Sequence, residues 1–343
     1  MRILAIETSC DETAVAVLEC SGTLPVPEFK VLGNSLMSQI HIHKEYGGVY
    51  PMLAKREHIK NLPILLPKTM QEADNSDVDY IAVTSGPGLE PALWTGIEFA
   101  KELGKKWGKR VIPVNHMEGH LFSYMFEQSK PIEFPAIALL VSGGHTELVH
   151  VEDFDKYKII GRTRDDAVGE AFDKTARLLG LPYPGGPKIS ELAEISRNRG
   201  GVPAFHFPRP MIKSGDLNFS YSGLKTSVLY TTRKLGELDL KTKESLAEAF
   251  EDAAIEPLVE KTRAAANLHG AKTLIVGGGV AANKLLRKNL QALADELSLD
   301  FRLPIQSLTT DNAIMIGIAA YVRLLTNRAE SPDEIVARGN LDL

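Results

Sequence analysis

One pattern occurs twice in this chain of 343 residues, and it restricts the folds that the chain can adopt. Residues 3–18 run from an apolar segment through a polar turn into a second apolar segment. Residues 137–151 repeat this order around a turn of small residues. Paired apolar runs separated by turn residues predict β-hairpins. The duplication therefore indicates two similar lobes that face each other, each containing one of these hairpins.

Strand and helix patterns alternate in the remainder of the chain. Residues 78–83 form a short apolar run, which the glycine- and proline-containing turn 84–89 separates from a helical pattern. A strand, a glycine-rich turn and a helix in this order are typical of α/β proteins. Residues 52–73 predict a long amphipathic helix, with Pro63 or Pro67 as a candidate break. A chain with 44% hydrophobic residues can fill two cores.

The boundary between the two lobes is predicted near residue 110. The N-terminal lobe would comprise residues 1–110, completed by the last helix at 311–330. The C-terminal lobe would comprise residues 111–310 with helical insertions. The polar, proline-flanked residues 128–133 are an alternative position for this boundary. Helical patterns within the C-terminal lobe fall at 165–180, 188–197, 221–235, 241–268 and 283–297.

Two histidines lie four residues apart where a strand pattern is followed by a helical one. His116 and His120 would share one face of a helix, so both rings could bind one divalent metal ion. A helix start whose imidazoles only cap backbone groups or face water is an equally good interpretation of the spacing. Asp311 precedes the last apolar helix and offers a carboxylate, although it could instead cap that helix. Two histidines and one aspartate suit iron or zinc.

Two glycine-rich turns are candidate seats for phosphate or nucleotide. Ser142, Gly143 and Gly144 would expose backbone amides without side-chain obstruction, although an ordinary hairpin turn explains them as well. Residues 277–283 join a strand to a helix, which is where nucleotides often bind. These residues lack the Walker pattern and fit the dinucleotide fingerprint only loosely, so they indicate generic nucleotide binding.

Charge and composition exclude several other classes of protein. A formal net charge of −5 argues against autonomous nucleic-acid binding through one large basic face. The best local basic patch is 101–110 around Trp107, for which a solvated helix end is the stronger interpretation. Cys10 and Cys20 do not form a disulfide framework, and no run of 18 apolar residues occurs. We therefore expect a cytoplasmic protein without a membrane span.

Eight motifs occur in an order that resembles a known family. They are IETSCDET (6–13), HMEGH (116–120), LVSGGHT (140–146), GEAFDK (169–174), YPGGP (183–187), FSYSGLKT (219–226), GGVAAN (278–283) and TDN (310–312). Together they resemble the bacterial TsaD family of tRNA N6-adenosine threonylcarbamoyltransferases. The resemblance extends from residue 1 to about residue 325.

The resemblance implies a fold, a reaction and partners. The fold would be the α/β actin-like ATPase (ASKHA) fold, with two ribonuclease H-like lobes and an interlobe cleft. The reaction would move a threonylcarbamoyl group from threonylcarbamoyl-adenylate to N6 of adenosine 37, in tRNAs that read codons starting with A, and release AMP. The partners would be the tRNA, a non-catalytic paralogue of the same fold (TsaB-like) and a small ATPase (TsaE-like).

The resemblance also implies roles for individual residues. The family's metal ligands fall on His116, His120 and Asp311, which would hold Fe²⁺ or Zn²⁺, one ion per subunit. Asp11 would face the cleft and position or deprotonate the attacking amine. Asp173 would suit ribose hydroxyls and Asn283 the base or the ribose. The substrate-binding positions are Leu140, Val141, Ser142, Gly143, Gly144, Asp173, Gly186 and Asn283.

Some positions depart from the family pattern. Met52 stands where a glutamate is usual, and Glu90 and Trp94 lie in a stretch that is usually small and apolar. Ser190 replaces an acidic residue that contacts substrate in many members, and the tail at 337–341 lacks the usual basic ending. These differences bear on partner contacts and tRNA docking more than on the chemistry.

Two other enzyme classes are alternatives. A kinase or ATPase of the same fold could use the same glycine-rich turns, but its Mg²⁺ would prefer oxygen ligands to a histidine pair. A metallopeptidase of the zincin type needs a glutamate directly after its first histidine, whereas Glu118 is two places along. On a helix, Glu118 should point away from the metal. We therefore expect a transferase.

Overall fold

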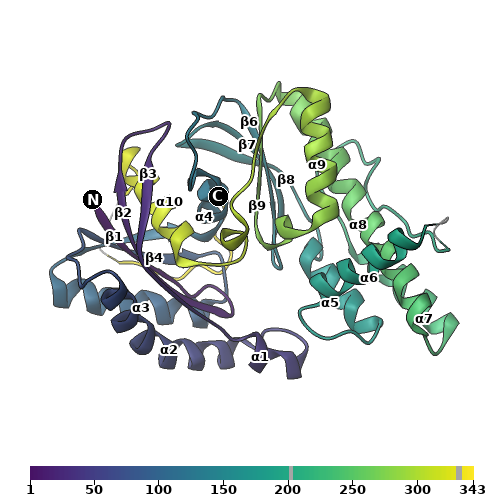
Figure 1. Cartoon of the computed structure of the whole chain (residues 1–343), viewed down its shortest axis with the longest axis horizontal. Helices are drawn as coiled ribbons and strands as arrows, with labels where there is room; N and C mark the ends of the chain where they lie inside the picture. The colour runs from purple at the N-terminus through teal and green to yellow at the C-terminus, as the bar shows by residue number, and fades with distance from the viewer. Residues whose placement is uncertain (201–203, 330–333) are drawn as a thin grey trace. The chain divides into compact units, whose positions relative to one another are not determined.

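The structure is a computed structural model, and it describes residues 1–200, 204–329 and 334–343 (Figure 1). The chain divides into two compact units. Unit 1 comprises Met1–Ile132, Asp153–Lys156 and Leu303–Leu343, and unit 2 comprises Glu133–Glu152 and Tyr157–Arg302. Among the described residues, no helix combines the length and the apolar character needed to cross a membrane. Cys10 and Cys20 are both free thiols.

Unit 1 is built on a five-stranded sheet with the order β3-β2-β1-β4-β5. Its strands are β1 (Arg2–Glu7), β2 (Glu12–Ser21), β3 (Glu28–Ser38), β4 (Tyr80–Gly86) and β5 (Arg110–Asn115). The first three strands are antiparallel, whereas β4 and β5 continue the sheet parallel to β1. The predicted hairpin at residues 3–18 is confirmed as β1 and β2.

Helices cover both faces of this sheet. They are α1 (Ile40–His43), η1 (Lys44–Tyr46), α2 (Pro51–Glu72), α3 (Glu90–Trp107), α4 (His116–Phe122), η2 (Ser123–Met125), η4 (Gln306–Leu308) and α10 (Ala313–Leu325). Leu62 and Leu65 of α2 and Leu93 of α3 pack in one core cluster with strand residues. On α10, Gly317 lies so close to Leu18 that an added Cβ would stand 2.8 Å from its methyl carbon. The small residue lets α10 approach the sheet closely.

The two prolines of α2 do not break the helix. Pro63 and Pro67 lie within a continuous helix and are both exposed. A proline leaves the carbonyl four residues earlier without its helical hydrogen bond. Here those carbonyls belong to exposed positions, where water can take the place of the missing donor.

Unit 2 repeats the strand order of unit 1. Its sheet runs β10-β9-β6-β7-β8, with β6 and β7 antiparallel and with β9 and β10 parallel to β6. The strands are β6 (Ala136–Val141), β7 (Thr146–Asp153), β8 (Lys156–Arg162), β9 (Thr273–Gly277) and β10 (Asp300–Arg302). The second predicted hairpin is confirmed as β6 and β7, and each unit places its hairpin beside parallel strands.

Among the described residues of unit 2, the five α-helices follow the order of the five helical patterns of the sequence, and the short helix η3 was not predicted. They are α5 (Val168–Leu178), α6 (Gly185–Arg199), α7 (Ser222–Leu235), α8 (Leu240–His269), η3 (Gly279–Ala282) and α9 (Lys284–Leu297). Ion pairs join α6 to α8: Arg197 binds the buried Glu251 and Arg199 binds the buried Glu244, each at 2.5 Å.

The boundary between the units falls between Ile132 and Glu133, within the alternative segment 128–133 and not near residue 110. The first unit extends to Ile132 because β5 pairs in parallel with β4, for example through Val111 opposite Ile81. Strand pairing therefore keeps β5 and α4 in unit 1. The C-terminal residues from Leu303 onward also belong to unit 1.

Candidate metal centre

The short helix α4 carries both histidines. Its start is fixed by Asn115, the last residue of β5, whose side chain accepts a hydrogen bond of 2.8 Å from the Met117 amide. His116 and His120 then lie one turn apart, with ring centroids separated by 4.7 Å and planes at 85°. Both are buried. The predicted i, i+4 geometry is confirmed.

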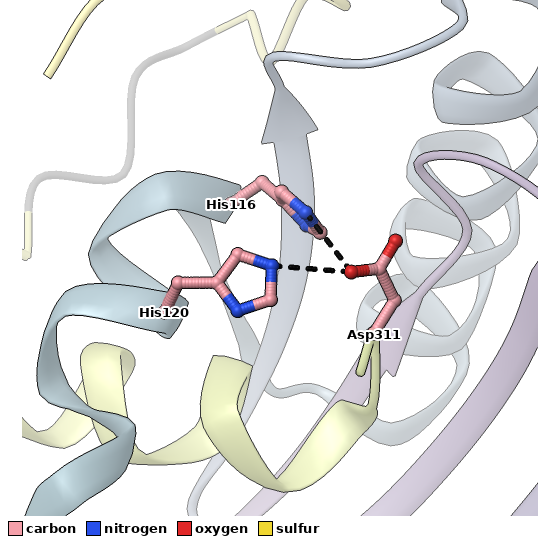
Figure 2. Close-up of side chains that lie close together, drawn as sticks. All are labelled: His116, His120 and Asp311. Atoms are coloured by element: carbon pink, nitrogen blue, oxygen red, sulfur yellow. Dashed lines mark hydrogen bonds and ion pairs between the residues drawn. The ribbon is translucent and has the colours of Figure 1, made fainter. Parts of the chain in front are cut away.

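Asp311 reaches the same point from the segment before α10. Its Oδ1 atom lies 3.4 Å from His116 Nε2 and 3.1 Å from His120 Nε2 (Figure 2). The ligand atoms of the three residues all lie within 4.8 Å of one another. Two imidazoles and one carboxylate that leave other positions open suit iron or zinc better than Mg²⁺. The donor set therefore fits a divalent transition metal.

The alternative role of Asp311 as a helix cap is wrong. Helix α10 begins at Ala313, and Asn312 caps it by accepting a hydrogen bond of 2.9 Å from the Met315 amide. Because its neighbour caps the helix, the carboxylate of Asp311 can face the histidines.

A buried glutamate supports His116 from the side opposite Asp311. Glu7 Oε2 lies 3.0 Å from His116 Nδ1, and Thr84 donates to the same oxygen at 2.6 Å. The other oxygen, Oε1, accepts the Ser9 amide at 2.5 Å. A carboxylate on the outer nitrogen of a metal-binding histidine orients the ring and raises its basicity. The sequence offered one signal for this role: an acidic residue ends an otherwise apolar strand.

Charge around His116 changes its protonation. Burial lowers the pKa of His116, but the carboxylates of Asp311 and Glu7 outweigh burial and raise it well above its ordinary value. Burial raises the pKa of Asp311, but the two histidines lower it by more, so the net shift of the Asp311 pKa is downward. In the metal-free protein, His116 therefore holds a proton between two carboxylates.

We expect metal uptake near neutral pH to release about one proton per site, because the proton on His116 competes with the metal. Metal affinity should rise with pH. Without metal, the raised pKa stabilises the fold below about pH 6.5, and this stabilisation is lost as pH rises through the raised value. Titration calorimetry in buffers of different ionisation enthalpy measures the release. Enthalpies that do not depend on the buffer would contradict it, and Glu7→Gln should reduce the release.

Glu118 points away from the metal ligands, as predicted. Its side chain is 3% exposed and binds Arg323 Nε at 2.6 Å and Arg328 Nη2 at 2.9 Å. These bonds tie α4 to α10 and to the residues after it. A glutamate engaged in this way cannot activate a metal-bound water, which argues against the metallopeptidase.

The C-terminal tail supports the same region. The Arg338 amide donates to Ser85 O at 2.8 Å, and the Gly88 amide donates to Gly339 O at 3.1 Å. Asn115, which caps α4, donates through Nδ2 to Asp342 O at 2.9 Å. The tail thus packs on the turn after β4 and on the start of the histidine helix.

Asp11 lies in the turn between β1 and β2, in the same unit as the metal ligands. It is 7% exposed, and its backbone oxygen accepts the Gln39 amide at 2.9 Å. Its neighbour Glu12 is also largely shielded. Burial, followed by the charges of Asp11 and Asp311, raises the pKa of Glu12 to about 10. Glu12 therefore carries a proton beside the Asp11 carboxylate.

In unit 2, the hairpin turn after β6 offers fewer open amides than predicted. The Ser142 amide closes the hairpin on His145 O at 2.8 Å, and the Gly144 amide bonds to Ser142 Oγ at 3.3 Å. The Gly143 amide makes no hydrogen bond to the described residues. Gly143 and Gly144 are exposed, and a Cβ on either would meet no atom within 4 Å.

Glycines bring this turn close to the second predicted seat. An added Cβ on Gly278, whose φ is +90°, would stand 2.3 Å from Val141 O. An added Cβ on Gly169 would stand 2.5 Å from Ser142 O. The end of β6, the start of α5 and the turn after β9 therefore meet through close backbone contacts, as Leu140–Gly277 pairing also requires.

The remaining substrate-binding candidates of unit 2 are partly engaged. Asp173 Oδ1 accepts the amide of Gly185, the first residue of α6, at 2.7 Å, and Gly186 is the next residue of that helix. Asn283 caps α9 through the Leu286 amide at 2.8 Å. Its Nδ2 atom donates to Ser190 Oγ at 2.9 Å and to Glu251 Oε1 at 2.7 Å. Both protons of the Asn283 side-chain amide are therefore used. Its Oδ1 atom accepts the Leu286 amide with one lone pair, so the second lone pair of Oδ1 is what the side chain can offer a ligand.

The basic stretch 101–110 contains the end of α3, which agrees with the interpretation as a helix end that the sequence favoured. Lys101 pairs with Glu98 and Lys109 with Asp77, each at 3.0 Å. Trp107 packs against the core cluster of unit 1.

The sheet order, repeated in both units, defines the class of the protein as the actin-like ATPase fold. HypF of T. kodakarensis superimposes with a TM-score of 0.59 at 13% identity, covering 98% of this chain and 49% of that chain. A second HypF structure, in a phosphate- and nucleotide-bound form, gives 0.60 at 12% identity over 96% of this chain and 47% of its own. This similarity shows the fold alone, and the predicted fold class is confirmed.

Sequence comparison then gives the family within this fold. The model of the family described as TsaD, tRNA N6-adenosine threonylcarbamoyltransferase, matches residues 30–318. The enzyme of that name from Ralstonia pickettii is 46% identical over 339 residues, 97% of this chain and 94% of its own. The one from Thermosipho africanus is 45% identical over the full length of both chains. The chain belongs to the tRNA N6-adenosine threonylcarbamoyltransferase family, and the predicted family and activity are confirmed.

Proposed function

We propose that this chain transfers the threonylcarbamoyl group from threonylcarbamoyl-adenylate to N6 of adenosine 37, in tRNAs that read codons starting with A. The N6 nitrogen bonds to the carbamoyl carbon, the bond from that carbon to the phosphate oxygen breaks, and AMP leaves. The observation that carries this proposal is the convergence of His116, His120 and Asp311 in a member of the family.

His116, His120 and Asp311 would hold one Fe²⁺ or Zn²⁺ ion per subunit. A bound ion of this kind supplies Lewis-acid chemistry that polarises an oxygen of the substrate. Glu7 would keep Nε2 of His116 directed at the ion through its contact with Nδ1. Glu118 takes no part, since it binds Arg323 and Arg328.

Asp11 would bind and orient the attacking amine and accept its proton. The lone pair of an adenine amine is delocalised into the purine, so the amine is a weak nucleophile and gains from a positioned base. The protonated neighbour Glu12 adds no second negative charge beside Asp11.

The hairpin turn of unit 2 would bind the adenylate. Gly143 N–H and the Ser142 hydroxyl are the donors for the phosphate, where negative charge builds as AMP leaves. Leu140, Val141 and Gly144 would form the strand end and turn around it. Asp173 and Gly186 would approach the ribose, and the carbonyl oxygen of Asn283 would approach the base or the ribose.

The protein would act in the cytoplasm within an assembly. Its net charge of −5 leaves it short of positive charge for holding tRNA alone. A TsaB-like paralogue and a TsaE-like ATPase are the partners that family membership suggests. Purified chain should bind tRNA weakly at physiological salt and more tightly once partners are added; tight binding and sustained turnover by the chain alone would contradict this.

Nucleoside analysis of cells depleted of this chain tests the function. Threonylcarbamoyladenosine should fall in their tRNA and return when the wild-type chain is restored. Unchanged threonylcarbamoyladenosine after depletion would refute the proposal.

A further inference from the structure

Two tyrosine rings stack on each other at the surface of unit 1. The ring centroids of Tyr46 and Tyr50 lie 6.1 Å apart with the planes at 25°, and the residues are 61% and 55% exposed. Tyrosine usually buries its ring and leaves only the hydroxyl in water. An exposed aromatic pair is therefore a candidate binding surface.

The backbone beneath these rings is held in place. Tyr46 ends η1, and Gly47 closes that turn at a φ of +66°, with its amide 3.2 Å from Lys44 O. Tyr50 directly precedes α2, and its amide donates to Nδ1 of the buried His43 at 3.3 Å. Both rings therefore project from backbone positions that hydrogen bonds hold, and they stack on each other there.

A buried polar network connects this surface to the turn that carries Asp11. His43 Nε2 lies 3.1 Å from Gln39 Oε1, and the Gln39 amide donates to Asp11 O at 2.9 Å. His58 completes the network, with Nδ1 3.3 Å from Gln39 Nε2 and Nε2 2.9 Å from Cys10 O. The backbone of Tyr50 and the backbone of Asp11, the proposed base, are thus linked through the same hydrogen-bond network.

The segment of the sequence that carries the two tyrosines is positively charged, in contrast to the chain as a whole. Residues 41–60 contain four lysines and arginines against two glutamates, a formal charge of +2, whereas the whole chain carries −5. Lys44 and Lys55 make no ion pair with any residue that the structure describes. Unpaired lysines in the same segment as exposed aromatic rings favour a phosphate-bearing ligand over a protein.

We propose that Tyr46 and Tyr50 form a stacking site for an unpaired nucleobase of the RNA substrate, next to the turn of Asp11. The inference rests on the proposed function, which makes tRNA the substrate. Bases stack on the π-face of an aromatic ring whatever their sequence, and Lys44 and Lys55 of the same segment would neutralise the phosphate backbone. Stacking needs the ring and not the hydroxyl, so phenylalanine should replace either tyrosine.

Binding of unmodified tRNA to the chain with its partner subunits tests the proposal. Tyr46→Ala and Tyr50→Ala should each weaken tRNA affinity roughly tenfold. Tyr46→Phe and Tyr50→Phe should bind like the wild type. Tyr230→Ala is the matched control, because Tyr230 is 65% exposed on α7 of unit 2. In steady-state kinetics, the alanine variants should change only the KM for tRNA, which should rise. Their metal content and melting temperature should equal those of the wild type.

An unchanged tRNA affinity in both alanine variants would overturn the proposal, as would an equal loss in the phenylalanine variants. Loss of a partner subunit from the alanine variants, with tRNA affinity intact, would assign the rings to a protein contact and also overturn it. A wild-type chain that binds tRNA through these rings but forms no threonylcarbamoyladenosine would refute the proposed function and leave the stacking site standing.

Discussion

His116→Ala should purify without stoichiometric metal, and its transfer rate should fall by more than about 100-fold. Mutating a residue that only supports a metal ligand lowers activity by up to about 100-fold, and the loss of a ligand itself should exceed this. The reason is geometric: Nε2 of His116 and Nε2 of His120 both face one oxygen of Asp311. Removing either ring leaves two ligands, too few to hold a divalent ion tightly. Elemental analysis of anaerobically purified protein measures the metal directly.

His41→Ala is the matched control, because His41 is an exposed histidine of the same unit. It should keep full metal content and activity. The folding of His116→Ala should be checked by its melting curve, because the substitution also removes the hydrogen bond between His116 Nδ1 and the buried Glu7. Unchanged metal content in a folded His116→Ala and a folded His120→Ala would rule out the ligand assignment.

Asp11→Asn should lower the rate of transfer by about 10² to 10⁴, the usual contribution of a positioned acid or base. Metal content and binding of threonylcarbamoyl-adenylate should stay at wild-type levels, because Asp11 is neither a metal ligand nor part of the unit 2 turn. The amide has the shape of the carboxylate but cannot accept the proton. Single-turnover transfer with bound intermediate measures the chemical step.

Asp74→Asn is a suitable control, since Asp74 is an exposed aspartate of unit 1. It should transfer at the wild-type rate. A near-normal single-turnover rate in Asp11→Asn would remove Asp11 from the reaction, and a loss of metal in the same variant would make it a structural residue.

Local patterns in the sequence predicted the local parts of this fold. Apolar runs around small turns gave the two hairpins, because a strand buried on both faces needs a continuous apolar run. The i, i+4 spacing predicted the histidine pair, because helix geometry alone places both rings on one face. Pro63 and Pro67 misled the helix prediction, since their exposure within α2 is a tertiary property.

Interactions between distant residues were beyond the sequence. Glu7 and His116 are 109 positions apart, and no local pattern links a strand end to a helix start. The sequence could not decide between residue 110 and residues 128–133 as the boundary, because the parallel pairing of β5 with β4 is also nonlocal. Asp311 and Asn312 are adjacent polar residues before one helix, and only the geometry shows that Asn312 caps it.

The most direct test of the account is transfer from synthetic threonylcarbamoyl-adenylate to unmodified tRNA by the metal-loaded chain with its partner subunits. Mass spectrometry of the digested tRNA should show threonylcarbamoyladenosine at position 37, with AMP formed in equal amount. Asp11→Asn and His116→Ala should form neither product at a comparable rate. Absence of threonylcarbamoyladenosine with a metal-loaded, folded wild-type chain would contradict the account.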